Sequence, residues 1–498
     1  MTWKSPVIMI GLDAATWDVI NPLLASGRLP NIARLMREGT WGRLRSILRY
    51  PSPALWTSIT TGRLPEKHGV LDFYNDTRLH LHCLTIYDIL GMSGCRVGLF
   101  RWFATWPPDP NTAFTVPPYT ARSLETHPEK LGFLNDLVHP TGFRSYLKSG
   151  LQLIRHGARP PTLLKSAVEL MYEAIARPEQ REWGYRRRLL EAVIYTDVFA
   201  HLLREYQPGF AAIHYLLIDD LGHFYWKYRE PQIFSDVTAA EARKYGEVID
   251  AAYITADKAL GIILRSMPED ALVLVLSDHG QEAIKAGTLH ISVEKLIELL
   301  GFQDRVLATA LIDSTFFRPR FVEDSHKTLN EFRGLIEQIE LKEESGKLFR
   351  IKSQSERGIE VKIRFGSEVG LNSAVSLPDG RVIKLGDIAS TRGRRSGTHS
   401  EWGILIMRGP GVRRDHEVEG ASILDVAPTV LALRGQPVSR DMDGQVIEDA
   451  IEESFLNQNP MRFIESYETV ERVDEEMPFT EEELEEIESK LRALGYLS

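Results

Sequence analysis

Acidic and histidine side chains follow three apolar runs of this sequence, at positions where they could act together on a ligand. They are Asp13 after residues 7–12, Asp219 and His223 after residues 210–218, and Asp278 and His279 after residues 272–276. If the runs are parallel strands, their carboxyl ends share one edge of a sheet, which is where ligands bind in open α/β proteins. One aspartate at such an end is more often a helix N-cap than a ligand. Three together, two of them with a histidine, favour a binding site.

A sixth candidate ligand is His399, which lies just before another apolar run at residues 404–407. Three aspartates and three histidines suit Zn²⁺, Mn²⁺ or Fe better than Mg²⁺ or Ca²⁺, which prefer oxygen ligands. Six side chains divide naturally into two sites of three. Two metals about 3.5 to 4 Å apart can clamp the attacking and leaving oxygens of a phosphoryl transfer. The sequence therefore predicts two divalent transition-metal ions, with Zn²⁺ as the best match.

The candidate nucleophile for such a reaction is Ser52, which lies between Pro51 and Pro53. This pattern predicts Ser52 at a helix N-cap and Pro53 at the first helical position, where free backbone N–H groups and the helix dipole favour an anion. An ordinary capping serine fits the same pattern, and the spacing alone favours neither role. A hydroxyl beside metal ions can lose its proton at neutral pH and attack phosphorus in line.

The elements that must position these residues are apolar runs alternating with helical patterns. This alternation predicts an α/β protein with a mostly parallel central sheet flanked by helices. We expect a catalytic core over residues 1–301 and 391–450, with a helical insertion at about residues 119–190. Residues 302–390 mix apolar and charged residues and predict a smaller α+β insertion.

An acidic tail occupies residues 451–498 and ends in a predicted helix. Its apolar residues are spaced for one helical face: Leu484, Ile487, Leu491 and Leu494. We expect this helix to dock on the protein or to bind a partner, and an oligomer could form through it.

Composition limits the classes of partner. Of 498 residues, 43% are hydrophobic, and the net charge of -10 comes without a long basic stripe, which argues against nucleic acid. Two cysteines are too few for a disulfide framework. The sequence contains no apolar run near the ~20 residues of a membrane span and no cleavable signal pattern. We therefore expect a soluble cytoplasmic protein with no membrane partner.

The motifs, taken in order, resemble those of the alkaline phosphatase superfamily. Within it they are most similar to the type I phosphodiesterase/nucleotide pyrophosphatase group and its bacterial phosphohydrolase and phosphomutase relatives. The segments that carry the resemblance are residues 8–13, 52–62, 65–69, 219–223, 276–280, 397–403 and 425–430. Their conjunction in this order is more specific than any one of them.

The resemblance implies a fold, a set of ligands and a reaction. One metal would be held by Asp219, His223 and His399. The other would be held by Asp13, Asp278 and His279, with Ser52 as the nucleophile bridging toward both ions. The expected activity is hydrolysis of a small phosphate ester or nucleotide-like substrate through a phosphoryl- or nucleotidyl-serine. The expected fold is alkaline-phosphatase-like.

One departure from the family pattern concerns the phosphoryl contact. Diesterases of this group have an asparagine five residues after the histidine of the Pro-x-x-His-Gly motif. Here that histidine is His68, and the position is occupied by Phe73, while Asn75 is out of register. A phosphomonoesterase or phosphomutase of the same superfamily is therefore an alternative.

A few residues bear on whether the chain belongs to another functional class. A monoesterase would need cations, which Arg392, Arg394 and Arg395 could supply, although a run of this kind is more often a solvated loop. A sulfatase would need a proline and an arginine where Ala54 and Trp56 stand. A catalytically silent binding or scaffold protein is a second alternative, and the complete set of ligand-type residues argues against it.

Overall fold

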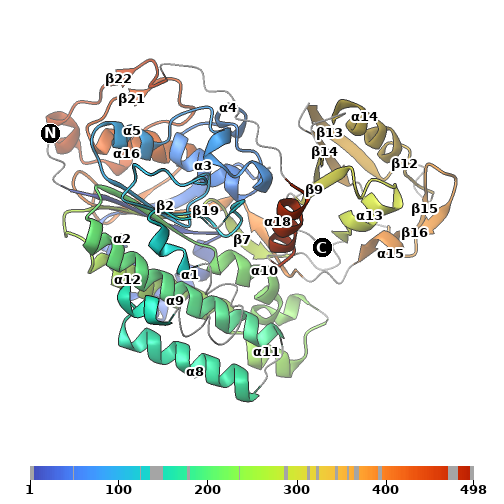
Figure 1. The fold of residues 1–498 in the computed structure, drawn as a ribbon, viewed down its shortest axis with the longest axis horizontal. Coiled ribbons are helices and arrows are strands. Elements are labelled where there is room, and N and C mark those ends of the chain that lie inside the picture. The colour runs from blue at the N-terminus through green and yellow to red at the C-terminus, as the bar shows by residue number, and fades with distance from the viewer. Residues whose placement is uncertain are drawn as a thin grey trace. The chain divides into compact units, whose positions relative to one another are not determined.

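The computed structural model divides the chain into two compact units (Figure 1). It describes residues 5–48, 50–123, 125–134, 150–176, 180–234, 236–284, 290–310, 315–320, 325–342, 346–355, 358–363, 369–390, 395–468 and 480–493. The first unit comprises Met1–Arg229, Val237–Glu282 and His399–Glu475. The second comprises Glu230–Asp236, Ala283–Thr398 and Glu476–Ser498.

An eight-stranded sheet forms the centre of the first unit. Its order is β20 (His416–Val418), β2 (Thr40–Arg45), β19 (Trp402–Arg408), β6 (Leu272–Leu276), β1 (Val7–Leu12), β5 (Phe210–Tyr215), β3 (Val97–Phe100) and β4 (Phe114–Val116). Strand β19 runs antiparallel to β2 and β6, and the other described pairings of this sheet are parallel. The predicted mostly parallel α/β sheet is confirmed.

Helices cover both faces of this sheet, because its central strands are mostly apolar. Strands β1, β5 and β6 are buried at every residue, so each needs a helical layer on either side. On one face lie α1 (Trp17–Ala25), α2 (Pro30–Glu38), α9 (Gln180–Tyr206), α10 (Leu217–Arg229) and α12 (Val248–Leu264) (Figure 1). On the other lie α3 (Ser52–Thr61), α5 (Ile86–Met92) and α16 (Val426–Leu433).

The second unit has its own small sheets and core. One sheet has the order β13 (Phe349–Ser355), β14 (Gly358–Ile363), β10 (Thr315–Pro319) and β9 (Val306–Ala310). Another has the order β12 (Gly346–Lys347), β11 (Glu340–Leu341), β15 (Ala374–Ser376) and β16 (Val382–Lys384). Its helices include α13 (Val293–Leu299), α14 (Ser325–Ile336) and α15 (Leu385–Ile388). Helix α14 buries Leu329, Phe332 and Ile336 from one face in the core of this unit.

The C-terminal helix α18 (Glu481–Ala493) belongs to the second unit. Its predicted apolar face is buried, with Leu484, Ile487 and Leu491 at most 2% exposed, and Arg320 pairs with Glu488 at 3.0 Å. Leu494 lies outside the described residues. Oligomerisation through this helix stays a prediction. Among the described residues, no helix combines the length and apolarity needed to cross a bilayer.

Candidate metal centre

The predicted ligands meet at one edge of the large sheet because of the strand directions. Strands β5 and β6 are both parallel to β1, so Asp13, the first turn of α10 and the residues after β6 lie beyond the same ends. Strand β19 is antiparallel and pairs Leu405 with Leu276, so the residues before it, including His399, return to that edge. The residue after Asp13, Ala14, has a left-handed φ of 61°, which turns the chain sharply at the edge.

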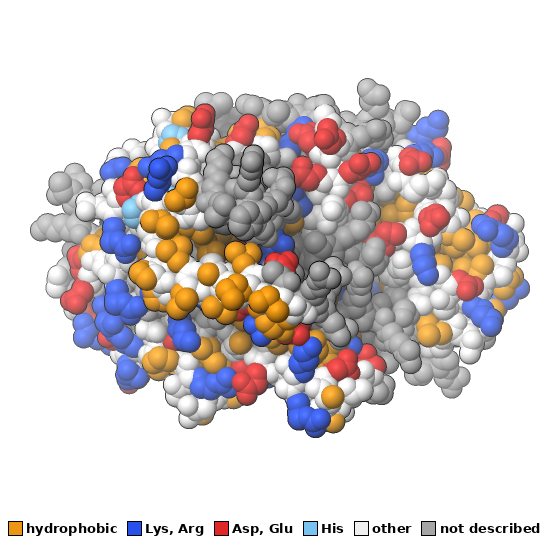
Figure 2. Space-filling view, turned by 60° about the horizontal axis from the view of Figure 1, so that its bottom comes forward, with side chains coloured by type: hydrophobic (Ala, Val, Ile, Leu, Met, Phe, Trp, Pro, Cys, Tyr) orange, Lys and Arg blue, Asp and Glu red, His pale blue; other side chains and the backbone are white. Residues whose placement is uncertain are grey.

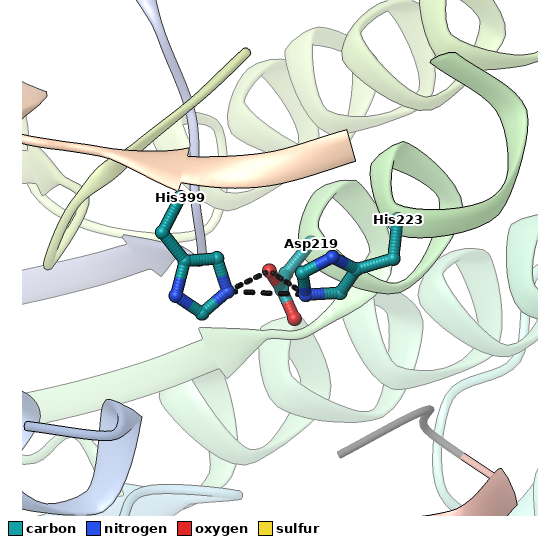
Figure 3. A group of neighbouring side chains, drawn as sticks. All are labelled: Asp219, His223 and His399. Carbon is teal, nitrogen blue, oxygen red and sulfur yellow. Dashed lines mark hydrogen bonds and ion pairs between the residues drawn. The ribbon is translucent and has the colours of Figure 1, made fainter. Parts of the chain in front are cut away.

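Asp219, His223 and His399 form the first ligand group (Figure 3). Asp219 and His223 are one turn apart on α10 and therefore share a helix face. The Oδ1 atom of Asp219 lies 3.0 Å from Nε2 of His223 and 3.2 Å from Nε2 of His399. The two Nε2 atoms are 3.0 Å apart. Three potential ligand atoms thus converge on one point from a helix and from the segment before β19.

The spacing within this group fits a small tetrahedral cation. Nitrogen and oxygen ligands lie about 2.0 to 2.1 Å from Zn²⁺, so the ligand atoms of a tetrahedral site are roughly 3.3 Å from one another. The observed separations of 3.0 to 3.2 Å are close to that value. Two imidazoles with one carboxylate are also a donor set that zinc and similar ions accept.

The second group contains Asp13, His279 and again Asp219. Nε2 of His279 lies 3.6 Å from Oδ1 of Asp13 and 3.4 Å from Oδ2 of Asp278, so Asp278 adjoins this group. The structure therefore brings all six predicted ligands together. Asp219 has carboxylate oxygens within reach of both groups, although the family resemblance assigned it to one. A carboxylate between two groups can link two ions.

Burial makes this site electrostatically costly without a cation. Asp13, Asp219 and Asp278 are at most 1% exposed. Burial, followed by the charges of Asp278 and Asp219, raises the pKa of Asp13 well above its usual value. Burial also raises the pKa of Asp278, despite the opposing effect of His279. For Asp219 burial acts in the same direction, but its contacts with His223 and His399 outweigh it and hold the pKa well below the usual value.

Several buried polar atoms at this site make no hydrogen bond within the described part of the chain. They are Oδ1 of Asp13, both carboxylate oxygens of Asp278, Nε2 of His279 and Oγ of Ser52. Buried polar atoms without partners are rare in folded proteins, and binding of an ion is one of the standard reasons for them. The residues present therefore fit divalent cations.

Ser52 is the first residue of α3, and its side chain does not cap the helix. The N-cap is Pro51, so the helix begins one residue earlier than predicted and Pro53 takes the second position. The predicted N-cap role is therefore wrong. The Ser52 side chain is 1% exposed. A buried hydroxyl that neither caps its helix nor hydrogen-bonds to another described residue is available for a further partner.

Two side chains that the sequence analysis missed hold Asp13. His214, the fifth residue of β5, lies opposite Gly11 in the parallel register, and its Nε2 is 3.0 Å from Oδ2 of Asp13. Nε1 of Trp56 donates to the same oxygen at 3.4 Å. Burial lowers the pKa of His214 to about 3, so its imidazole is neutral. Because both contacts are made to Oδ2, the Oδ1 atom of Asp13 is left to face the second group.

Gln281 supports Asp219 in a similar way. Its Nε2 donates to the backbone oxygen of Asp219 at 3.1 Å and to Oδ1 at 3.3 Å. The contact requires Gly222, because a Cβ there would lie 1.5 Å from Oε1 of Gln281. The glycine in the Asp-Asp-Leu-Gly-His segment is thus explained by close packing against the amide that orients Asp219.

The Pro-x-x-His-Gly segment is attached to α3 through His68. Nδ1 of His68 accepts from the backbone N–H of Val70 at 3.2 Å, and Nε2 lies 3.0 Å from Oγ of Ser58. Burial lowers the pKa of His68 to about 3, so the ring is neutral and Nε2 carries the proton. The departure at Phe73 is a buried aromatic side chain, 3% exposed. Of the three arginines considered for a monoester, Arg392 and Arg394 lie outside the described residues.

The family model for type I phosphodiesterase / nucleotide pyrophosphatase matches residues 7–368. The chain therefore belongs to this family, which confirms the resemblance seen in the motifs. Asp13, Ser52 and the ligands from Asp219 to His279 lie inside the matched region. His399 lies beyond it, and the geometry places it 3.2 Å from Asp219 as the motifs predict.

Solved structures with a similar fold include two mammalian proteins. Human ectonucleotide pyrophosphatase / phosphodiesterase 5 is 12% identical, with a TM-score of 0.48 over 90% of this chain and 100% of that one. The murine protein of the same name, in an inactive form in complex with AMP, is 12% identical with a TM-score of 0.46 over the same shares. A comparison with curated protein sequences found no match. The family assignment rests on the family model.

Proposed function

We propose that this protein is a two-metal hydrolase of phosphoric esters that attacks phosphorus through Ser52. Membership of the type I phosphodiesterase / nucleotide pyrophosphatase family supports a phosphodiester or nucleotide-like substrate. The observation that carries the proposal is the position of the Asp219 carboxylate within reach of two ligand groups. It lies next to buried atoms that make no hydrogen bond to any described residue.

In the proposed site one ion is held by Asp219, His223 and His399. The other is held by Asp13, Asp278 and His279, and zinc suits both donor sets, with manganese or iron as alternatives. When bound, such ions neutralise the buried carboxylates, polarise a phosphoryl oxygen and lower the pKa of a neighbouring hydroxyl.

The geometry of α3 supports Ser52 as the nucleophile. Trp56 lies one turn after Ser52, and residues four apart lie on the same helix face. Trp56 contacts Asp13 from this face, so the Ser52 hydroxyl is directed toward the same edge of the sheet. Its burial excludes bulk water from the hydroxyl, which favours attack by serine over direct hydrolysis in the first step.

The proposed reaction has two steps. In the first, the Ser52 hydroxyl loses its proton, its Oγ forms a bond to phosphorus, and the bond from phosphorus to the leaving oxygen breaks. The leaving group then takes up a proton. In the second step water attacks the phosphoseryl group, the Oγ–P bond breaks, and Ser52 regains a proton.

A phosphomonoesterase or phosphomutase is the second candidate function, favoured by the buried Phe73 at the position of the family asparagine. A panel of aryl phosphodiesters, phosphomonoesters and sulfate esters, assayed with added Zn²⁺ or Mn²⁺, separates the two. We expect the diester to be hydrolysed fastest. A monoester rate above the diester rate under matched conditions would favour the second candidate, and turnover of none of them by a metal-loaded, folded protein would favour a scaffold.

A further inference from the structure

Helix α8 (Pro160–Ala176) faces the protein with its polar side, the reverse of an ordinary surface helix. Thr162 is 1% exposed and donates to Oδ2 of Asp197 on α9 at 2.6 Å. Glu169, one of the other inward residues, is 9% exposed and pairs with Arg186 of α9 at 3.2 Å. Hydrogen bonds and ion pairs therefore attach α8 to α9.

The outward side of α8 is apolar. Leu164, Val168, Met171 and Ile175 recur at helical spacing, and each is between 54% and 76% exposed. Leu151 and Ile154 in the preceding segment are exposed to a similar degree. We call these six side chains the apolar band. Figure 2 shows a band of hydrophobic side chains running across this face.

Such a surface is unusual for a water-facing helix. Surface helices turn their apolar stripe to the core and their charged residues to water. Scattered exposed apolar residues need no explanation, but a contiguous patch of them marks an interaction site. Because the polar side of α8 is held by specific partners on α9, the helix cannot bury its apolar side by rotating without breaking those contacts.

The charge around the band indicates an anionic partner. In the sequence, residues 137–168 contain five Lys or Arg residues and no Asp or Glu, in a chain whose net charge is -10, and the stretch 137–149 lies outside the described residues. Of these, Arg155 is exposed next to Ile154. The side chain of Arg159 is 40% exposed and pairs with the buried carboxylate of Asp197 at 2.5 Å, so Arg155 is the clearest basic neighbour of the band. Figure 2 shows Lys and Arg side chains beside the hydrophobic band. Apolar side chains flanked by basic ones are the pattern of a helix that lies in a membrane interface.

We propose that the apolar band docks the protein on the surface of an anionic lipid bilayer. The apolar side chains of α8 enter the boundary between headgroups and acyl chains, and the exposed Arg155 beside them contacts anionic headgroups. A second copy of the chain would bring the two basic segments together, which like charges oppose. The sequence predicted no membrane partner because it contains no candidate spanning segment, but a helix that lies in the membrane interface does not need one.

Flotation with lipid vesicles tests this proposal. Wild type should float with vesicles of equal parts phosphatidylcholine and phosphatidylglycerol at low salt, and much less with phosphatidylcholine alone or at high salt. The variant carrying Met171→Ser and Ile175→Ser should partition roughly a hundredfold less, about tenfold for each side chain. Arg155→Gln should weaken binding about fivefold and only with the anionic vesicles.

Met92→Ser is the matched control, because Met92 is 69% exposed but lies on α5, outside the band. It should float like wild type, and all variants should keep the wild-type melting temperature and circular dichroism spectrum, which shows that they are folded. Failure of wild type to float, equal binding to both kinds of vesicle, or unchanged binding of the double variant would overturn the proposal. A dimer seen by sedimentation, and lost in the double variant, would assign the band to a second copy instead.

Discussion

The two ligand groups of the site differ in charge. This difference shows which buried carboxylates the chain can neutralise with its own histidines and which need a cation. In the first group one carboxylate, Asp219, faces two imidazoles, and its pKa is held well below the usual value. In the second group Asp13 and Asp278 share one imidazole, and both have raised pKa values because of burial. We infer that the second group depends more strongly on its cation than the first.

Replacing Asp219, which lies within reach of both ligand groups, should have the largest effect on metal content and turnover. Asp219 is a ligand of the first proposed ion and lies within reach of the second group, so Asp219→Asn should lose the first ion, weaken binding of the second and lower turnover by several orders of magnitude. Asp278→Asn should lose only the ion of the second group. Elemental analysis after dialysis against Zn²⁺, together with diester turnover, measures both effects. An Asp219→Asn variant that keeps two ions and near wild-type turnover would contradict the shared role.

The next largest expected effect is on the stability of the metal-free protein, where the two ligand groups should respond differently to pH. A carboxyl whose pKa is raised on folding stabilises the fold at acid pH, and this contribution is lost as the pH rises from the unfolded pKa toward the folded one. Asp13 and Asp278 are of this kind. With a chelator present, Asp13→Asn should raise the free energy of unfolding at neutral pH by on the order of 2 kcal/mol and flatten this decline.

Asp219→Asn is the matched control for that measurement. The pKa of Asp219 is lowered on folding, so its contribution is present at neutral pH and is lost as the pH falls through the folded pKa. The substitution should therefore lower the stability of the metal-free protein at neutral pH. Urea denaturation across a pH series gives both results. A loss of stability in Asp13→Asn at neutral pH would contradict the difference between the groups.

The smallest expected effect comes from the partners of Asp13. His214→Phe removes the contact at 3.0 Å from Oδ2 and should weaken binding of the second ion by about 10- to 100-fold, with the first ion unaffected. Trp56→Phe removes a longer contact of 3.4 Å and should have a smaller effect. Zinc titration with a competing chelator measures the two affinities. Equal weakening of both ions by His214→Phe would show that the groups are not independent.

The fold was predictable because its signal lies in short apolar runs followed by polar residues. Asp13, Asp219 and Asp278 were found by their place after such runs, without knowledge of the structure. His214 was missed because a single histidine inside an apolar strand forms no sequence motif that distinguishes a functional residue from a core residue. Trp56 was missed for a similar reason, since an aromatic residue in a buried helix is typical of packing.

Two further differences from the sequence analysis have simple physical causes. The predicted cap at Ser52 was wrong by one residue because two prolines flank it, and either could begin the helix. Helix α8 lies within the predicted helical insertion, but its periodic pattern shows only that it has two faces. Which face is turned inward depends on partners such as Asp197, which the local sequence does not contain.

The measurement that tests the central proposal most directly compares Ser52→Ala with Ser52→Thr and Ser58→Ala. Ser58 is a second buried serine of α3, paired with His68, and its replacement should cost about 1 kcal/mol of stability and leave turnover nearly intact. Ser52→Thr should keep part of the activity because it keeps the hydroxyl.

For each protein, metal content, melting temperature and diester turnover are measured, and acid-quenched samples are searched by mass spectrometry for a phosphorylated or nucleotidylated Ser52. We predict that Ser52→Ala keeps its ions and its fold, loses turnover by orders of magnitude, and carries no modified peptide, whereas wild type does. A Ser52→Ala variant within a few-fold of wild-type turnover would contradict covalent attack through this serine.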